Sequence, residues 1–287
     1  MRRLSWVQRN GYLNLLLRLE HLRTYSLQSP VDLSTSGTSL SDNSIFNDFC
    51  ATAASSDLIF RNFRRYKPLI QVLDHVGIEH ARRYLEYVKD ERYSMQSLLP
   101  TLRIMDSIGS PRRFWFRDIG LVSPTVTRYL KVYVEMRKIF GNLDGLVISE
   151  IGVGFGGQAF LINELARPSK YFLFDLPSTI SLAMKYLRCL HSHGDFERVD
   201  GRAPKTVSSD LVISNYALSE LTKDVQAMYL ENVISKATMG YVTWNLLSER
   251  ILDGFRLDEV LSLIPGSKCI PEVPHTSPGN VIIIWNR

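Results

Sequence analysis

A short apolar run that leads directly into a glycine-dense turn is the feature of this sequence that most constrains its fold. Residues 147–158 read VISEIGVGFGGQ, and Val147, Ile148 and Ile151 suit a buried strand. The glycines permit a tight turn with close backbone approach to a ligand. Residues 158–165 continue as a helix whose free N–H groups would face that ligand. We therefore predict a strand–turn–helix unit that binds a nucleotide-type cofactor.

Two kinds of cofactor fit this turn. Gly152, Gly154 and Gly157 satisfy the G-x-G-x-x-G dinucleotide fingerprint. Glu150, Gly152, Gly154 and Gly156 instead give E-x-G-x-G-x-G, the first motif of S-adenosylmethionine-dependent methyltransferases. A purely structural turn between a strand and a helix also uses glycine, so the motif alone leaves the alternatives open.

An acid after the next apolar run supports a cofactor site. Residues 170–175 read KYFLFD, and Leu176-Pro177 breaks the run before a helix that starts near Ser178. In this class of sheet, an acid about 20 residues past the turn accepts hydrogen bonds from ribose hydroxyls. We predict that role for Asp175, although a capping aspartate would have the same position.

The rest of the chain alternates strands with helices. Such alternation is typical of an α/β, doubly wound Rossmann-like sheet, here with seven strands, a terminal antiparallel hairpin and a helical N-terminal region. A helix should open at Ala217 and continue through Val233 and Ile234. The further strands are expected at 196–199, 210–216, 240–245, 268–272 and 280–285.

Several blocks of this sequence together resemble a family of sugar O-methyltransferases. The resemblance covers roughly residues 100 to 287, and SNYALSEL at 214–221 is its most specific part. Two substitutions in the first motif, Val153 and Phe155, and His275 near the end depart from the family pattern. The blocks are YLKVY at 129–133, FGNLDG at 140–145, EIGVGFGGQ at 150–158, FDLP at 174–177, DLVISNYALSEL at 210–221 and PEVPHTSPGN at 271–280.

The resemblance implies a class I methyltransferase that uses S-adenosylmethionine to methylate a hydroxyl of a sugar, nucleotide sugar or glycan precursor, in surface-polysaccharide biosynthesis. It does not identify the sugar. The residues expected to bind the cofactor are Glu150, Gly152, Gly154, Gly156, Gln158, Asp175, Leu176 and Asn215.

Methyl transfer to a hydroxyl needs alignment and one group that accepts the hydroxyl proton. Glu220 is the first candidate for this base, because it lies just past a strand end and burial can raise the pKa of a carboxylate. A glutamate there could instead stabilise a helix N-terminus. His275 is the second candidate, and Tyr216 would position the cofactor or the acceptor. Further candidates are His191, His193 and Glu272.

Metal ligands and nucleic-acid contacts are not indicated. No compact set of carboxylates and histidines has metal-ligand spacing, so we expect a metal-independent reaction. The net charge of +5 is modest, and the basic residues form no long run. That charge would suit an anionic acceptor or a membrane surface, or it is scattered solvated charge.

The three widely spaced cysteines and the lack of a long apolar segment indicate a reduced, cytoplasmic protein without a transmembrane span. We divide the chain into a basic N-terminal helix and linker at 1–44, a helical cap or acceptor region at 45–140, and the methyltransferase domain at 141–287. The first helix could contact a membrane surface or a partner. In the second region, Trp115 or Phe116 could stack on a sugar, although aromatic side chains more often pack in a core.

Two other functions remain open from the sequence. One is an NAD-dependent nucleotide-sugar oxidoreductase or epimerase, which Glu150 and the missing Tyr-x-x-x-Lys pair disfavour. The other is an inactive scaffold with a cofactor-binding fold. The oligomeric state cannot be predicted.

Overall fold

The computed structural model describes residue 39 and residues 42–91, 95–245 and 253–287. The predicted basic helix at the start of the chain and most of the following linker lie outside the described residues.

A seven-stranded sheet forms the centre of the molecule, in the order β5-β4-β3-β6-β7-β9-β8. The strands from β3 to β7 are parallel, and β9 runs antiparallel to its neighbours β7 and β8. This order confirms the predicted doubly wound sheet with a terminal antiparallel hairpin. The strands are β3 Val147–Ile151, β4 Lys170–Asp175, β5 Phe196–Asp200, β6 Ser209–Asn215, β7 Ala237–Trp244, β8 Lys268–Pro271 and β9 Val281–Asn286.

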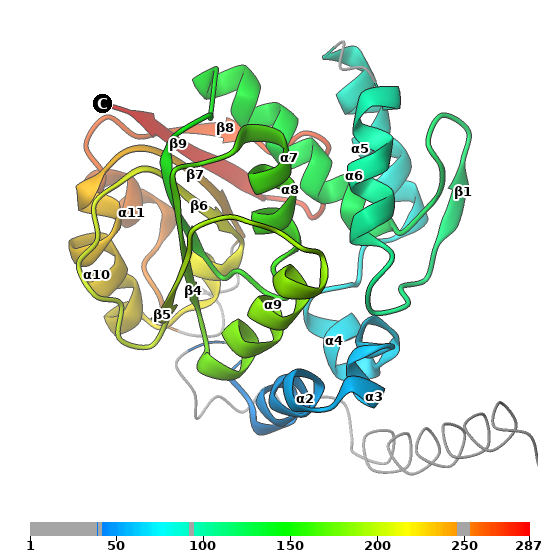
Figure 1. Ribbon diagram of the computed structural model, residues 1–287. Coiled ribbons are helices and arrows are strands. Elements are labelled where there is room, and N and C mark those ends of the chain that lie inside the picture. Colours follow the sequence, from blue (N-terminus) through cyan, green and yellow to red (C-terminus); the bar gives the residue numbers. More distant parts are fainter. Residues whose placement is uncertain (1–38, 40–41, 92–94, 246–252) are drawn as a thin grey trace, which may run out of the picture.

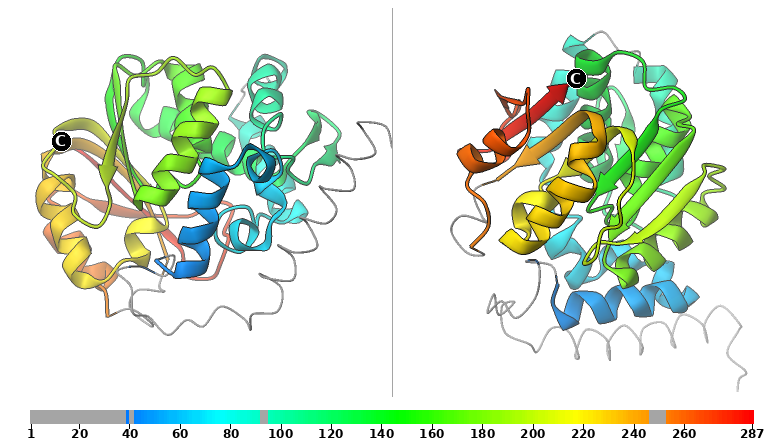
Figure 2. Two further views of the ribbon diagram at one scale, coloured as in Figure 1. Left: turned by 60° about the horizontal axis from the view of Figure 1, so that its bottom comes forward. Right: turned by 90° about the vertical axis from the view of Figure 1, so that its left-hand side faces the viewer.

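Helices cover both faces of the sheet (Figures 1 and 2). Alternate residues of each strand belong to two different hydrophobic clusters, because successive strand side chains point to opposite faces. The helices α7 Pro124–Phe140, α8 Gly157–Ala166 and α9 Pro177–Cys189 cover one face. The helices α10 Lys223–Asn232 and α11 Leu257–Leu263 cover the other.

The N-terminal helices share the core of the α7–α9 face. Phe63 lies edge-on to Phe155 of the glycine turn with ring centroids 5.6 Å apart, so the helical region packs directly on the cofactor-type turn. Its elements are α2 Ser44–Ser55, α3 Asp57–Phe60, the 3-10 turn η1 Phe63–Arg65, α4 Lys67–Val72, α5 Ile78–Asp90 and α6 Met95–Met105.

One segment of this region is not helical. Strands β1 Phe114–Phe116 and β2 Gly120–Val122 form a small antiparallel hairpin. Phe116 and Val122 are buried, whereas the side chain of Trp115 is 75% exposed. The alternation of buried and exposed residues therefore has the period of a strand and not that of a helix.

The predicted helix after β6 is interrupted. Residues Ala217–Glu220 form a 3-10 turn, η2, which ends at Leu221 in extended conformation, and α10 starts only at Lys223. The hydroxyl of Ser214 accepts a hydrogen bond from the backbone N–H of Leu218 at 3.0 Å, which draws the turn back onto the strand end. Glu220 therefore belongs to the turn at the edge of the sheet and not to the first turn of α10.

The chain's last part closes the same edge. The hairpin of β8 and β9 pairs with β7, and the loop between its strands returns to the carboxyl ends of β6 and β7.

Among the described residues, no helix is long and apolar enough to cross a membrane.

Candidate active site

A cavity of about 450 Å³ lies at the carboxyl ends of the central strands. The sheet order reverses between β3 and β6, and ligands of doubly wound proteins bind at such a point. The lining residues come from the glycine turn, the ends of β4 and β6, the segment around α5, helix α7 and the closing loop. They include Leu73, His75, His80, Tyr84, Arg128, Glu150, Gly152, Gly154, Asp175, Leu176, Gly201, Asn215, Tyr216, Glu220, Asn245, Thr276 and Asn280.

The glycine turn has the backbone conformation that its residues predict. Gly152, Gly154 and Gly156 have φ of 80°, 55° and 89°, which side chains of L-residues rarely adopt. A Cβ on Gly152 would lie 2.1 Å from the Cβ of Ala217, so this glycine also permits close contact between the turn and η2. Gly152 and Gly154 line the cavity.

Asp175 closes the turn from the end of β4. One carboxylate oxygen accepts the backbone N–H of Gly154 at 2.8 Å, and the other accepts that of Leu176 at 2.7 Å. Burial raises the pKa of Asp175 to about 6, against the opposing effect of these hydrogen bonds. The carboxylate is thereby fixed at the cavity wall, with lone pairs left for further donors.

Glu150 is the most deeply buried acid that lines the cavity. It is only 2% exposed, and its carboxylate accepts a hydrogen bond from the hydroxyl of Tyr171 at 2.7 Å. Burial raises the pKa of Glu150 to about 8, partly offset by the Tyr171 hydrogen bond. A positively charged ligand beside it would favour the ionised form.

The end of β6 contributes Asn215 and Tyr216. The Asn215 side-chain oxygen is buried and has no hydrogen-bond partner among the described residues. Such a group normally finds a partner, so a ligand donor in the cavity would satisfy it. The Tyr216 hydroxyl instead donates to Glu272 and lies 2.8 Å from the Thr276 hydroxyl. Tyr216 thus fastens the closing loop to the strand end.

Glu220 lies at the end of η2, and its carboxylate accepts a hydrogen bond from the side-chain amide of Asn245 at 2.9 Å. Burial raises its pKa, whereas the Asn245 hydrogen bond and the charge of Arg128 lower it. The structure therefore combines a lining carboxylate with a raised pKa and a fixed orientation, as a general base requires.

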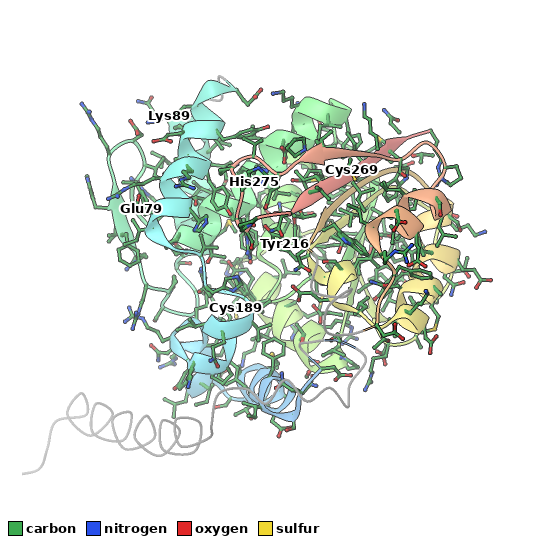
Figure 3. All side chains as sticks on the ribbon, turned by 180° about the vertical axis from the view of Figure 1, so that it is seen from behind. Glu79, Lys89, Cys189, Tyr216, Cys269 and His275 are labelled. Carbon is green, nitrogen blue, oxygen red and sulfur yellow. The ribbon has the colours of Figure 1, made fainter. Side chains whose placement is uncertain are left out.

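Three predicted site residues, His275, Gln158 and Gly156, do not line the cavity. His275 is exposed on the closing loop, because Glu272 accepts hydrogen bonds from the backbone and the hydroxyl of Thr276 and so turns Thr276 inward (Figure 3). Gln158 is buried, and its amide donates to the backbone carbonyl of Tyr129 at 3.2 Å, in the contact between α8 and α7. The further candidates His191 and His193 are exposed, and neither lines the cavity.

Several lining residues have no signal in the sequence. His75, His80 and Tyr84 come from the segment that ends in α5, and Arg128 comes from α7. They lie far from the glycine turn along the chain, and only helix packing brings them to it.

No group of three or more histidines, cysteines or acids in the described part of the chain is arranged to hold a metal ion.

The fold and the cavity define a Rossmann-like protein with a cofactor-type site at its topological switch point. No family model matches the sequence, and no curated protein matches it.

Solved structures that resemble the chain include three methyltransferases. The magnesium protoporphyrin IX methyltransferase from Synechocystis, solved with bound S-adenosylmethionine, is 15% identical with a TM-score of 0.42, over 56% of this chain and 84% of that one. A methyltransferase from Pyrococcus furiosus is 14% identical with a TM-score of 0.41, over 55% and 81%. A S-adenosylmethionine-dependent methyltransferase from Clostridium acetobutylicum is 8% identical with a TM-score of 0.44, over 55% and 91%. At this level of likeness, residue roles cannot be carried over.

Proposed function

We propose that this chain is a S-adenosylmethionine-dependent O-methyltransferase whose acceptor is a hydroxyl of a sugar or glycan precursor. The observation that carries the proposal is that Glu150, the glycine turn, Asp175, Asn215 and Glu220 line one cavity at the switch point of the sheet. The sugar acceptor rests on the sequence resemblance, most of all on residues 214–221.

The residues of the cavity fit S-adenosylmethionine. Asp175 would accept hydrogen bonds from the ribose hydroxyls, and Gly152 and Gly154 leave room for the ligand at the turn. The orphan oxygen of Asn215 and the buried carboxylate of Glu150 would both favour a cationic donor such as an ammonium group.

When bound, S-adenosylmethionine supplies an electrophilic methyl group. The chain's own contribution is to align the acceptor hydroxyl and to take up its proton. Glu220 would accept that proton on its carboxylate, while the Asn245 amide holds the other side of the group in place. Tyr216 would act indirectly, by holding the closing loop over the cavity.

Calorimetric titration with S-adenosylhomocysteine and with NAD tests the cofactor assignment. We expect S-adenosylhomocysteine to bind and NAD not to bind. Asp175→Ala should remove measurable binding, because two ribose hydroxyls lose a charged acceptor worth about 1.5–3 kcal/mol for each hydrogen bond.

Asp195→Ala is the matched control. Asp195 is exposed and lies just before β5, at the opposite edge of the sheet, so its substitution should leave the affinity unchanged. If NAD bound in place of S-adenosylhomocysteine, the chain would be an oxidoreductase or epimerase. Binding of S-adenosylhomocysteine without turnover in a broad screen of sugar acceptors would favour an inactive scaffold.

A further inference from the structure

Arg128 brings a positive charge to the cavity and forms no ion pair with any described residue. Its guanidinium donates a hydrogen bond to the backbone carbonyl of Leu73 at 3.4 Å. It also lies over the Tyr129 ring, 5.7 Å from the ring centroid, and interacts with the Tyr129 hydroxyl. A guanidinium has several N–H donors and stays ionised at every physiological pH. Most of the donors of Arg128 are therefore left for a ligand.

The side chains around Arg128 do not neutralise it. Three phenols affect it electrostatically, those of Tyr129, Tyr216 and Tyr84, and burial raises the pKa of all three, to about 12 for Tyr129 and Tyr84. These phenols are therefore neutral at pH 7. The charge of Arg128 lowers the pKa of Glu220, but the two side chains form no ion pair, and the Glu220 carboxylate accepts its hydrogen bond from Asn245.

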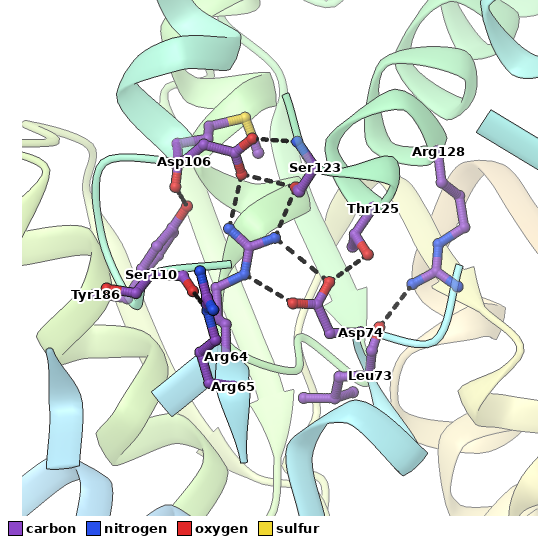
Figure 4. A network of polar contacts seen from close by, with 11 residues as sticks. Arg64, Arg65, Leu73, Asp74, Asp106, Ser110, Ser123, Thr125, Arg128 and Tyr186 are labelled. Atoms are coloured by element: carbon purple, nitrogen blue, oxygen red, sulfur yellow. Dashed lines mark hydrogen bonds and ion pairs between the residues drawn. The ribbon is translucent and has the colours of Figure 1, made fainter. Parts of the chain in front are cut away.

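A buried network joins Asp74, the residue before His75, to Thr125 on α7, the helix that carries Arg128 (Figure 4). Arg64, only 1% exposed, contacts Asp74 at 3.0 Å and the hydroxyl of Ser123 at 2.9 Å. Asp74 also accepts a hydrogen bond from Thr125, three residues before Arg128 on α7.

The same network pairs two further acids with Arg64. Arg64 binds Asp106 at 2.9 Å as well as Asp74, so both carboxylates are already paired with its guanidinium. Asp74 directly precedes His75, and Thr125 lies about one helical turn before Arg128. The network thus holds Arg128 and His75 in place, and its two acids pair with Arg64 and not with Arg128. A guanidinium that is fixed in position and has no paired acid is preorganised to bind an anion.

We propose that Arg128, with His75 and His80 beside it, binds an anionic group of the methyl acceptor, a carboxylate or a phosphate. The inference rests on the proposed function and narrows its acceptor to an acidic or phosphorylated sugar. The three residues line the cavity from the helical region, whereas Asp175 and Gly201 line it from the sheet. Arginine pairs with both anions through parallel N–H donors, and an imidazole beside it can donate a further hydrogen bond.

The first test asks which molecule supplies the anion, because S-adenosylmethionine carries a carboxylate of its own. S-adenosylhomocysteine and 5′-methylthioadenosine, which lacks that carboxylate, are titrated into the wild type, Arg128→Met and Arg128→Lys. We expect S-adenosylhomocysteine to bind Arg128→Met within about threefold of the wild type. A loss of about tenfold or more that spares methylthioadenosine would assign Arg128 to the cofactor and overturn the proposal.

The second test uses inorganic phosphate as the probe. Phosphate is added to the protein saturated with S-adenosylhomocysteine, at constant ionic strength set with chloride, and the thermal midpoint is measured. We expect a saturable rise of the midpoint in the wild type, because a ligand that binds the folded state stabilises it. The rise should vanish in Arg128→Met and persist, at about tenfold weaker phosphate affinity, in Arg128→Lys, which keeps the charge and loses the planar fork.

Arg83→Met is the control, because Arg83 is exposed on α5, and it should respond to phosphate as the wild type does. No rise in the wild type, or an equal rise in Arg128→Met, would overturn the proposal. Should Arg128→Met fail to fold, the affinity of Arg128→Lys decides: an unchanged affinity excludes Arg128 as the anion ligand. If S-adenosylhomocysteine does not bind the wild type, the proposed function itself fails, irrespective of phosphate.

Discussion

Three acids line the cavity, and their surroundings suit them to different tasks. Burial raises the pKa of Glu150, Asp175 and Glu220 alike. Asp175 is held by two backbone N–H groups and Glu150 by a phenol, which fits ligand binding. Glu220 is held by an amide alone and lies beside a fixed cation, so it retains an oxygen for a proton. Such different environments allow some carboxylates of one site to bind the ligand while another acts as an acid or base.

Glu220→Gln should abolish most of the turnover and spare cofactor binding. An amide cannot accept the hydroxyl proton, and removal of a general base typically lowers the rate by about 10²–10⁴-fold. The affinity for S-adenosylhomocysteine should stay within about threefold, because the amide keeps the shape of the side chain. The rate is measured as transfer of labelled methyl from S-adenosylmethionine to an acceptor that the wild type methylates.

Asp224→Asn serves as the control for this variant. Asp224 is an exposed acid in the first turn of α10, four residues further along the chain, and its substitution should leave the rate unchanged. Full activity of Glu220→Gln would place the base elsewhere. His75 would then be the next candidate, because partial desolvation and Arg128 lower its pKa and keep the imidazole neutral at pH 7.

Among the elements, the contact between the glycine turn and η2 decides the shape of the cavity. Gly152 has a φ of 80°, and a Cβ there would lie 2.1 Å from that of Ala217. Gly145 also has a positive φ, 73°, but nothing lies within 4 Å of a Cβ built on it. The two glycines therefore separate the cost of backbone strain from that of a lost contact.

Gly152→Ala should destabilise the protein more than Gly145→Ala. The strain of an alanine at positive φ costs about 1–3 kcal/mol at either position. Overpacking adds about 1–3 kcal/mol at Gly152 alone, since η2 must move away from the turn. Urea unfolding measures both free energies, and S-adenosylhomocysteine binding should weaken only in Gly152→Ala. Equal losses of stability would mean that η2 moves away from the turn at no cost.

The strands could be predicted because each is a short apolar run bounded by turn residues. The hairpin of β1 and β2 was missed because its residues 114–122 lie between helices and contain only three residues in each strand. The break after η2 was missed because the apolar residues on both sides keep a helical spacing. At the break, the Ser214 side chain accepts the backbone N–H of Leu218, a local contact that competes with helical hydrogen bonding and leaves no mark in the spacing of apolar residues.

The residues expected to bind the cofactor could be predicted because they lie at or just after strand ends that the sequence marks. Glu150 and Asp175 end adjacent strands, and Asn215 and Glu220 follow the next one. The expected positions of these residues at the cavity follow from strand order alone. Arg128 could not be found in this way, since it lies on a helix before the sheet. Asn245 directly follows the carboxyl end of β7, next to β6, so strand order places it at the same edge, but its hydrogen bond to Glu220 has no signal in the sequence.

At the scale of the whole molecule, the cavity places ionisable groups inside a continuous core. The helical region and the sheet share one hydrophobic cluster, and Glu150 is buried at its edge. A carboxylate that folding takes out of water loses hydration, and its ionised form is destabilised. The fold therefore carries a stability cost that depends on pH.

Stability should fall as the pH rises between about 4.5 and about 8, by the contribution of Glu150. Its pKa is raised from 4.5 to about 8 in the folded protein, so the folded state binds more protons than the unfolded state in this window. Glu150→Gln removes this contribution, and its gain over the wild type should grow from near zero at pH 4.5 to a few kcal/mol, on the order of 1.4 per pKa unit, above pH 8. Urea unfolding at a series of pH values measures the difference.

The control is Glu164→Gln, an exposed acid on α8, which should follow the wild-type curve throughout. Asp175, with a pKa raised from 3.8 to about 6, adds a second loss between these values in both proteins and cancels in the comparison. A constant difference between wild type and Glu150→Gln would mean that Glu150 titrates normally.

The ammonium group of a ligand next to Glu150 should restore the ionised form of this carboxylate, so S-adenosylhomocysteine binding at pH 7 should release a proton in the wild type and not in Glu150→Gln. Calorimetry in buffers of different ionisation enthalpy measures that release and thereby ties the acid to the bound cofactor.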